Sequence, residues 1–236
     1  MPKTIAIIQS NYIPWKGYFD IIDSVDEFVL YDEVQFTKRD WRNRNVIKTQ
    51  NGPLWLTIPV VSKGRFDQAI DTVEIAEPWA EKHWRSLEMS YRKAAGFERT
   101  VAAGLKEAFK IDGERLLSDV NRKLLQWVCD HLDIKTPLTN SRDYGGAGAK
   151  SERLLQICLG AGADKYISGP SAKAYLDHDL FAAAGVAVEY KSYDGYPEYP
   201  QLHGPFDHAV SILDLLFNVA DDPKRYIKQS PTGAGT

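Results

Sequence analysis

The sequence predicts an α/β fold: a mostly parallel sheet with flanking helices, of the doubly wound, nucleotide-binding type, plus a helical insertion in the middle. Three observations predict it. Short apolar runs rich in β-branched residues alternate with helical patterns. Polar or glycine-rich segments follow several of these runs, where open α/β sheets collect ligands. The middle of the chain, residues 78–133, holds three helical patterns in succession.

Each predicted strand is a short apolar run that polar residues or a turn signal end. TIAII, residues 4–8, has the continuous apolar character of a strand buried on both faces. Asn51, Gly52 and Pro53 predict a tight turn ahead of another strand. The predicted strands cover residues 4–8, 27–31, 55–61, 72–75, 136–141, 165–168 and 186–190.

The predicted helices follow the strands or fill the middle of the chain. Pro14 and Gly17 open the first helix, and its apolar residues begin at Tyr18. The clearest apolar stripe runs at helical spacing from Leu116 to Leu132. The predicted helices after the first cover residues 78–93, 96–110, 113–132, 150–157, 173–176 and 209–217.

These elements predict one α/β core domain, residues 1–77 and 134–228, interrupted by a helical insertion or subdomain at residues 78–133. The insertion is expected to have a mainly structural role. The last residues, 229–236, carry no apolar pattern and predict a disordered tail.

Composition limits the functional classes. The chain has 236 residues, of which 44% are hydrophobic and 26% charged, and a formal net charge of -3, which indicates a globular protein and disfavours general nucleic-acid binding. Its two cysteines, Cys129 and Cys158, lie in apolar helical patterns, so neither a disulfide framework nor a zinc site is expected. The opening apolar run is too short for a signal peptide or a membrane span. We therefore expect a cytoplasmic protein with no membrane insertion and no tightly held metal.

The most unusual stretch is basic. QFTKRDWRNRNVIK, residues 35–48, carries five cations between Lys38 and Lys48 against one anion, Asp40, in an acidic chain. On a helix, cations four positions apart would repel one another, and a bound anion would relieve that repulsion. The Trp and Asn side chains between these cations can stack on the rings of a ligand or form hydrogen bonds with them. A phosphorylated ligand fits this pattern, and a solvated basic face is the alternative.

Three loops after predicted strands combine backbone donors with reactive side chains: residues 9–17, 145–151 and 168–171. The second loop ends in Lys150 and Ser151 at a helix start, which suits phosphate, but it lacks the P-loop spacing and reads equally well as a flexible linker. The candidate substrate- or nucleotide-binding residues are Gln9, Asn11, Tyr12, Trp15, Gly17, Tyr18, Asp32, Gln35, Arg42, Asn43, Arg44, Lys48, Ser151, Ser168, Gly169, Ser171, Tyr175 and Gln201.

The sequence contains no nucleophile motif and no metal-ligand motif. Chemistry is therefore expected to run through electrostatic positioning of an anionic substrate. His203 lies in a loop between two prolines, where a rigid backbone would fix an imidazole near a substrate. The candidate catalytic residues are His203, Lys150 and Lys38.

Six segments share a pattern with known proteins. They are QSNYIPWKGYF at residues 9–19, the segment 31–48 with WLTIPV at 55–60, KSERLLQICLGAGADKYISG at 150–169, and the segments 199–206 and 211–218. In combination they resemble the WbqC-like protein family over nearly the whole chain. One departure is Ser10, where proline is expected. The resemblance implies a place in bacterial gene clusters for O-antigen and other surface polysaccharides, in the modification of an amino sugar or sugar nucleotide.

The first loop is also similar, at the level of the fold, to the opening of nucleotide-activating α/β enzymes such as pantothenate synthetase. WKGY, residues 15–18, stands where those enzymes have two histidines. By this likeness, Lys150 and Ser151 would bind the phosphates of ATP, with Mg²⁺ as the accompanying ion. The reaction would be activation of an acyl or aminoacyl group by ATP, followed by amide formation on the amino sugar.

The expected partner is a sugar nucleotide or another phosphorylated small molecule. The alternative function is that of a non-catalytic binding partner in a polysaccharide-assembly complex, which would dock through the aromatic, proline-rich segment 193–206. RNA binding is disfavoured by the acidic net charge. The sequence leaves open whether the helical middle forms a homodimer contact.

Overall fold

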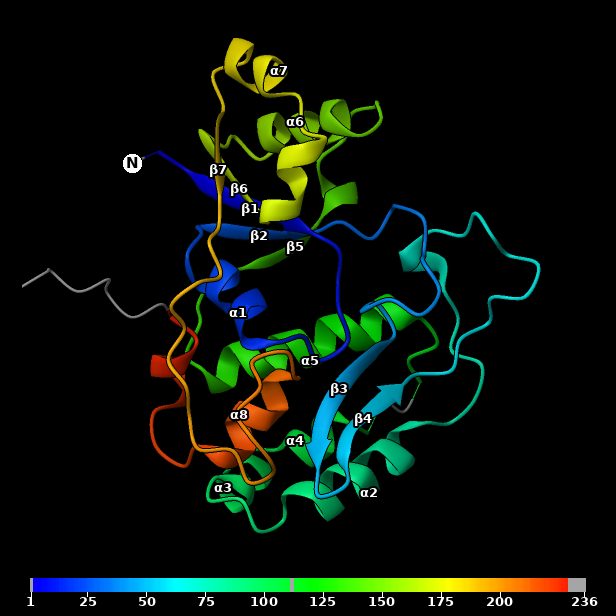
Figure 1. The fold of residues 1–236 in the computed structure, drawn as a ribbon. Coiled ribbons are helices and arrows are strands. Elements are labelled where there is room, and N and C mark those ends of the chain that lie inside the picture. The colour runs from blue at the N-terminus through cyan, green and yellow to red at the C-terminus, as the bar shows by residue number, and fades with distance from the viewer. Residues whose placement is uncertain (1, 111–112, 229–236) are drawn as a thin grey trace, which may run out of the picture.

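The computed structural model describes residues 2–110 and 113–228. Within them the main sheet has five strands in the order β5-β2-β1-β6-β7, and every neighbouring pair runs parallel (Figure 1). This confirms the predicted α/β fold with a mostly parallel sheet and flanking helices. The strands are β1 (Thr4–Ile8), β2 (Glu27–Leu30), β5 (Leu138–Asn140), β6 (Lys165–Ser168) and β7 (Ala187–Tyr190).

Most helices fall where the apolar patterns predict them. In the described part of the chain, the α-helices are α1 (Lys16–Asp23), α2 (Ala80–Tyr91), α3 (Phe97–Ala102), α4 (Leu105–Ala108), α5 (Leu117–His131), α6 (Ser151–Gly160), α7 (His178–Ala183) and α8 (Ile212–Asn218). Short 3-10 helices cover Ile70–Thr72, Ser141–Asp143, Pro170–Ala174 and Pro223–Tyr226.

The sheet buries apolar side chains on both faces, as a doubly wound sheet requires. Along β1, Ile5 and Ile7 belong to a hydrophobic cluster with residues of α6 and α7. Ala6 belongs instead to a larger cluster with residues of α1 and α5, because successive side chains of a strand point to opposite faces. Figure 1 shows α6 and α7 on one side of the sheet and α1 and α5 on the other.

The helical middle departs from the prediction at two points. Residues 96–110, predicted as one helix, form α3 and α4, and the break comes before Gly104, whose φ of 91° lies outside the helical region. α5 begins later than predicted because Leu116 still pairs with Glu74 in an isolated bridge. These helices share one hydrophobic cluster with the α1 side of the sheet. The domain boundaries themselves stay a prediction.

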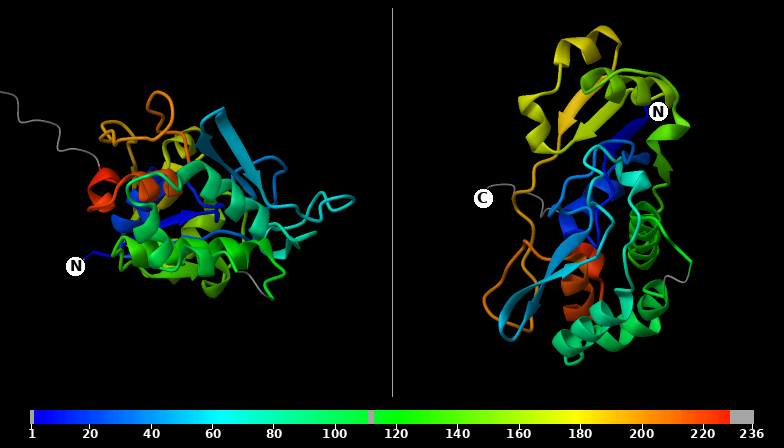
Figure 2. Two further views of the ribbon diagram at one scale, coloured as in Figure 1. Left: turned by 90° about the horizontal axis from the view of Figure 1, so that it is seen from below. Right: turned by 90° about the vertical axis from the view of Figure 1, so that its right-hand side faces the viewer.

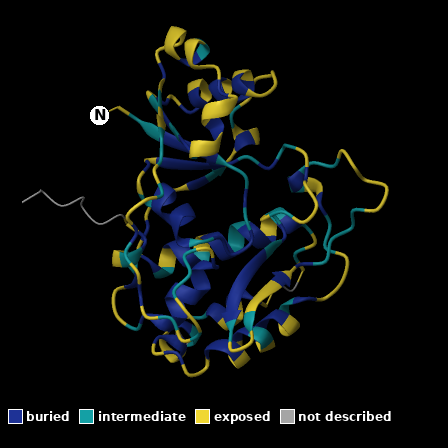
Figure 3. Cartoon of the chain, viewed as in Figure 1, coloured by how far each residue is buried: buried dark blue, intermediate teal, exposed yellow. Residues whose placement is uncertain are grey.

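The basic stretch enters a second sheet, a two-stranded antiparallel hairpin. β3 (Arg44–Thr49) pairs with β4 (Gly52–Thr57) across the predicted turn. The strand predicted at residues 55–61 therefore starts and ends earlier, and the one predicted at 72–75 is reduced to isolated bridges. Figure 3 shows β3 as largely buried and much of β4 as exposed.

After β7, the chain returns to the hairpin through a crossing segment, which we define as residues 191–211 (Figures 1 and 2). At its end, the Ser211 N–H donates to the Val46 carbonyl at 2.8 Å, and α8 follows. The predicted disordered tail, residues 229–236, lies outside the described residues. Among residues 2–110 and 113–228, no helix has the length and apolar character needed to cross a membrane.

Candidate functional site

The strand order places the topological switch point of the sheet between β1 and β6. The chain runs from β1 outward to β2 and β5, and it returns to the other side of β1 with β6 and β7. Ligands of open α/β sheets bind where the order reverses in this way. Gln9 follows β1 at this switch point, and Ser168 and Gly169 lie at the end of β6. Two of the three predicted loops therefore meet there.

Buried hydrogen bonds fix the start of the first loop. The fully buried Ser10 donates its backbone N–H to Asp32 Oδ1 at 2.7 Å, which ties the ends of β1 and β2 together. The Tyr18 hydroxyl donates to the Gln9 carbonyl at 2.9 Å. Burial raises the pKa of Asp32, while the hydrogen bonds from Ser10 and the charge of Arg42 lower it in part.

The hairpin holds the next part of the first loop in a strained turn. Ile13 has a φ of 38°, which is rare for a β-branched residue. Asn45 Nδ2 donates to the carbonyls of Tyr12 and Ile13 at 3.1 and 3.0 Å, and Asn45 Oδ1 accepts the Val46 N–H at 2.7 Å. The Tyr12 hydroxyl bonds to His83 Nδ1 at 2.8 Å. A strained backbone persists only where its surroundings determine it in this way.

Gly17 allows the Trp15 indole to fold back over the start of α1. A Cβ atom at position 17 would lie 2.3 Å from Trp15 Cζ2, so any larger residue would displace the ring. The indole also packs edge-on against Tyr193 and Tyr196 of the crossing segment, with centroids 5.0 and 5.7 Å away. The ring is therefore fixed between two segments that lie far apart in the sequence.

A cavity of about 310 Å³ lies beside the first loop. Its wall comes from the first loop, the basic stretch and the crossing segment. Arg42 Nη1 donates to Asn11 Oδ1 and so joins the first two of these segments. The lining residues are Asn11, Pro14, Trp15, Trp41, Asn45, His208 and Ala209. Apolar rings with a few polar groups are typical of the lining of a small-molecule site.

The cations of the basic stretch point to different places. Arg42 is held at the first loop, and its Nη2 lies 3.7 Å from Asp40 Oδ2. The backbone carbonyl of Arg42 accepts a hydrogen bond from Asn121 Nδ2 at 2.9 Å. Arg44 Cζ lies 4.1 Å from the centroid of the Trp55 ring. The stretch forms turns and a strand, so repulsion between cations one helical turn apart does not arise.

Lys48 is buried, and its partners are protein groups. Its Nζ donates to Gln201 Oε1 at 2.6 Å and to the Pro205 carbonyl. Gln201 Nε2 donates in turn to the buried Asp214 Oδ1 at 2.8 Å. Lys48 and Gln201 therefore join the hairpin to the crossing segment and α8, and neither lines the cavity.

Three more predicted residues of this region also lie off the cavity. Gln35 Nε2 donates to the Phe66 carbonyl at 3.0 Å. Asn43 is buried, and its Nδ2 donates to the Ile58 carbonyl at 2.9 Å. Lys38 is exposed. Of the basic stretch, Arg42, Trp41 and Asn45 are the part that the structure brings to the cavity.

His208, and not His203, lines the cavity. His203 Nε2 bonds to the Ser90 carbonyl at 2.7 Å, away from the cavity wall. The His208 ring stands edge-on to Phe206 at 4.5 Å, and its buried Nδ1 has no hydrogen-bond partner in the described part of the chain. Burial, and then the charge of Lys16, lower the pKa of His208. Sequence reasoning missed it because both histidines lie near prolines and aromatic residues.

Lys16 is the second group that sequence reasoning passed over. It is 2% exposed, and its Nζ lies 5.1 to 5.6 Å from three ring centroids of the crossing segment. The same Nζ donates to the Pro197 carbonyl at 2.7 Å. Burial lowers the pKa of Lys16 to about 8. The rings are those of Tyr196, Tyr199 and Phe206.

The glycine-rich loop forms a separate group. Lys150 is exposed and has a φ of 53°. The buried Ser151 Oγ lies 3.5 Å from the Tyr175 carbonyl and accepts the Asp177 N–H at 3.0 Å. Ser171 is exposed on the 3-10 helix after β6. None of these residues lines the cavity.

Gly169 connects the switch point to the cavity. A Cβ atom there would lie 3.6 Å from the Tyr193 hydroxyl, and the Tyr193 ring packs on Trp15 of the cavity wall. Ser168 Oγ, just before it, accepts from the Tyr166 hydroxyl at 3.1 Å. The end of β6 and the cavity are therefore neighbours through Tyr193.

A larger hollow of about 800 Å³ lies elsewhere, between α2, α4 and the segment 74–79. Trp79, Trp84 and Phe109 are part of its lining, and none of the predicted site residues is. The convergence of three segments beside the switch point makes the smaller cavity the stronger candidate.

The fold and this cavity define a doubly wound α/β protein with a cavity of small-molecule size beside its switch point. The chain belongs to the WbqC-like protein family, whose model matches residues 9–226, as the resemblance predicts. The "Uncharacterized protein Rv1507c" of Mycobacterium tuberculosis (strain ATCC 25618 / H37Rv) is 51% identical over 231 residues, which cover 96% of this chain and 100% of that protein. No solved structure matches the chain.

Proposed function

We propose that this protein is an enzyme of bacterial surface-polysaccharide biosynthesis, such as that of O-antigen, and that it modifies an amino sugar carried on a nucleotide. The observation that carries the proposal is the cavity beside the switch point, with two indoles, two amides and an imidazole in its lining and a guanidinium at Asn11. Membership of the WbqC-like family supports the pathway.

The cavity suits the sugar part of such a ligand. Trp15 and Trp41 offer apolar ring surface to a pyranose, and Asn11 offers an amide to its hydroxyl groups. Arg42, whose carboxylate partner is 3.7 Å away, offers planar donors to a phosphate. At about 310 Å³ the cavity is at the small end of ligand sites, so the nucleotide extends beyond its mouth.

The reaction that we propose is acyl or aminoacyl transfer with ATP as co-substrate. A carboxylate attacks the α-phosphorus of ATP and pyrophosphate leaves; the sugar amine then attacks the acyl carbon, forms the amide bond and releases AMP. His208 accepts the proton that the amine loses, because its lowered pKa keeps the imidazole neutral. Gln9, Ser168 and Gly169 offer polar and backbone groups to ATP at the switch point. Mg²⁺ would be held mainly by the phosphates.

The test combines calorimetry with a turnover assay. UDP-glucosamine and ATP should each release binding heat, and a mixture with a panel of carboxylic acids should yield pyrophosphate and an amide detectable by mass spectrometry. Arg42→Ala should abolish turnover and leave the thermal midpoint nearly unchanged. Full turnover in that variant would contradict the assignment of Arg42.

A second candidate is a non-catalytic binding partner in a polysaccharide-assembly complex. It is favoured by the exposed Trp41 and Trp55, each 44% accessible, whose rings lie 5.5 Å apart. The same calorimetry separates the two candidates, because a scaffold should release no binding heat with UDP-glucosamine or ATP.

A further inference from the structure

Three planar groups lie together on the hairpin side of the cavity. The Trp41 and Trp55 ring centroids are 5.5 Å apart, with their planes inclined by 32°, and Arg44 Cζ lies 4.1 Å from the Trp55 centroid. We call Trp41, Trp55 and Arg44 the indole platform. Trp41 also lines the cavity, so the platform continues the cavity wall outward.

The two indoles do little for the hydrophobic core. Each is 44% exposed, and Trp55 lies on β4, most of which faces solvent (Figure 3). The neighbouring Leu56 provides the buried contact of that strand, at 3% exposed. Large apolar groups left exposed beside a cavity mark a binding surface.

The platform also carries positive charge without a partner. In the described part of the chain, no ion pair involves Arg44, and its buried Nε has no hydrogen-bond partner. Lys38 and Arg39 of the same stretch are exposed. A guanidinium stacked on an indole keeps its N–H edge for an anion. A ligand with a planar ring and a phosphate would use both properties, whereas an apolar protein surface would leave the charges unpaired.

We propose that the indole platform binds the nucleobase of the nucleotide by stacking, with the phosphates near Arg42 and Arg44 and the sugar directed into the cavity. The proposal rests on the proposed function and adds a base-binding subsite to it. It assigns a ligand contact to Trp55, which does not line the cavity. Base stacking tolerates every nucleobase, so the platform sets affinity for nucleotides as a class.

The test is a titration of the full chain with UDP, ADP and glucosamine 1-phosphate, which lacks a base. We expect at least one of the two nucleotides to bind and to quench tryptophan fluorescence. Trp55→Ala should weaken that nucleotide between about fivefold and about a hundredfold. It should leave glucosamine 1-phosphate within about twofold of the wild type, and Trp55→Phe should restore most of the nucleotide affinity.

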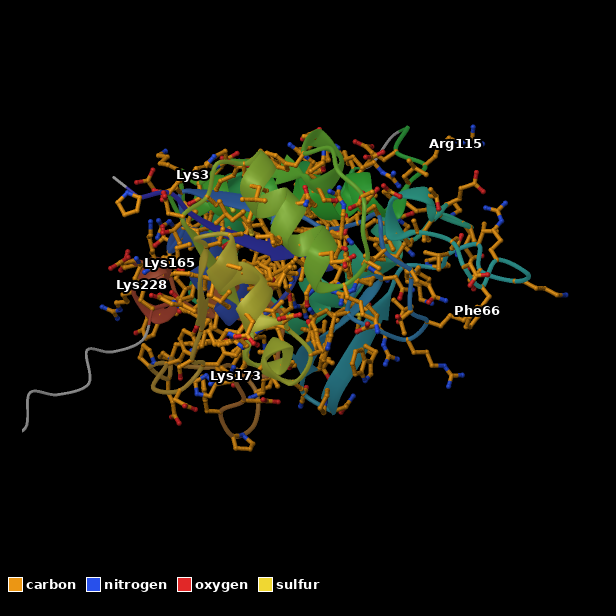
Figure 4. The ribbon with its side chains drawn as sticks, turned by 90° about the horizontal axis from the view of Figure 1, so that it is seen from above. Lys3, Phe66, Arg115, Lys165, Lys173 and Lys228 are labelled. Carbon is orange, nitrogen blue, oxygen red and sulfur yellow. The ribbon has the colours of Figure 1, made fainter. Side chains whose placement is uncertain are left out.

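Phe66→Ala is the matched control. Phe66 is 77% exposed on a loop that projects from the body of the protein (Figure 4), and its removal should change no affinity. If the Trp55→Ala variant is folded and binds the nucleotide with unchanged affinity, the proposal is overturned. The proposal is also overturned if the substitution changes the oligomeric state of the protein but not its affinity for the nucleotide. If only glucosamine 1-phosphate binds the wild type, the base subsite fails and the sugar site survives. If none of the three probes binds the wild type, both the base subsite and the proposed sugar site are contradicted.

Discussion

Two parts of the sheet's carboxyl edge are built in different ways. On what we call the cavity side, residues 9–18, the hairpin and the crossing segment are held together by buried side chains such as Asn45 and Tyr12. On the glycine-loop side, residues 141–151, Lys150 is exposed and a Cβ at Gly145 would meet nothing within 4 Å, while Gly146 and Gly148 lie against Gln156 and Glu152 of α6. The comparison teaches that groups from distant segments converge at the cavity, whereas the glycine-rich loop is held by Arg153 of the adjoining α6.

After the loss expected for Arg42→Ala, the largest expected effect is on turnover, from a change at His208. His208→Gln keeps a polar side chain at the cavity wall but removes the proton acceptor, so we expect turnover to fall by about 10² to 10⁴. His178→Gln is the matched control, because His178 bonds to the Tyr190 hydroxyl at 2.9 Å on an exposed surface. Affinity for UDP-glucosamine, measured by calorimetry, should change little in either variant. An equal loss of turnover in the His208→Gln and His178→Gln variants would contradict a catalytic role that is specific to His208.

Asn45→Ala should cost the most stability among changes at the cavity. It leaves two buried carbonyls of the strained turn and the Val46 N–H of β3 without their partner, so we expect a loss of about 2 to 3 kcal/mol in the free energy of unfolding. Asn140→Ala, at the start of the glycine-loop side, removes an exposed contact with Arg122 and should cost about 1 kcal/mol or less. Urea denaturation measures both. A smaller loss for Asn45→Ala than for Asn140→Ala would contradict the account.

The burial of His83, whose ring bonds to the Tyr12 hydroxyl, predicts a pH dependence of stability. Burial lowers the pKa of His83 from 6.5 to about 4. The imidazole of His83 is therefore protonated more readily in the unfolded chain than in the folded protein. The stability that the neutral, buried His83 contributes is complete above pH 6.5. It is lost as the pH falls toward 4, which lowers the free energy of unfolding by up to about 2 to 3 kcal/mol. Urea midpoints between about pH 7.5 and about pH 4.5 measure it. His83→Gln should flatten the slope, and an equally steep slope in that variant would exclude His83 as its source.

The smallest expected effect comes from adding one methyl group. Gly17→Ala would push the Trp15 indole from its place, and we expect affinity for UDP-glucosamine to fall by roughly tenfold, about 1.4 kcal/mol. Gly145→Ala offers the contrast, because a Cβ there meets nothing within 4 Å. It should leave affinity unchanged and raise stability slightly through the unfolded state. Equal affinities of the two variants would show that the position of Trp15 does not matter.

Local patterns were enough to predict the sheet. The strand at residues 165–168 was predicted at its observed bounds, because a buried parallel strand is a short apolar run with clear ends. β3 was not predicted, since its charged and amide side chains hide the strand pattern, and its burial comes from α2, α8 and the crossing segment, which lie far away in the sequence. Packing at long range likewise decides which of His203 and His208 meets the cavity.

The central claim is that a phosphorylated amino sugar binds in the cavity beside the switch point. The most direct test is NMR of the six indole N–H groups during titration with UDP-glucosamine, assigned by single Trp→Phe variants. The account predicts that the signals of Trp15 and Trp41 shift together and saturate, while that of Trp127, which stacks on His131 in α5, stays in place. Saturating shifts at Trp79 and Trp84 of the larger hollow, with Trp15 and Trp41 unmoved, would contradict it.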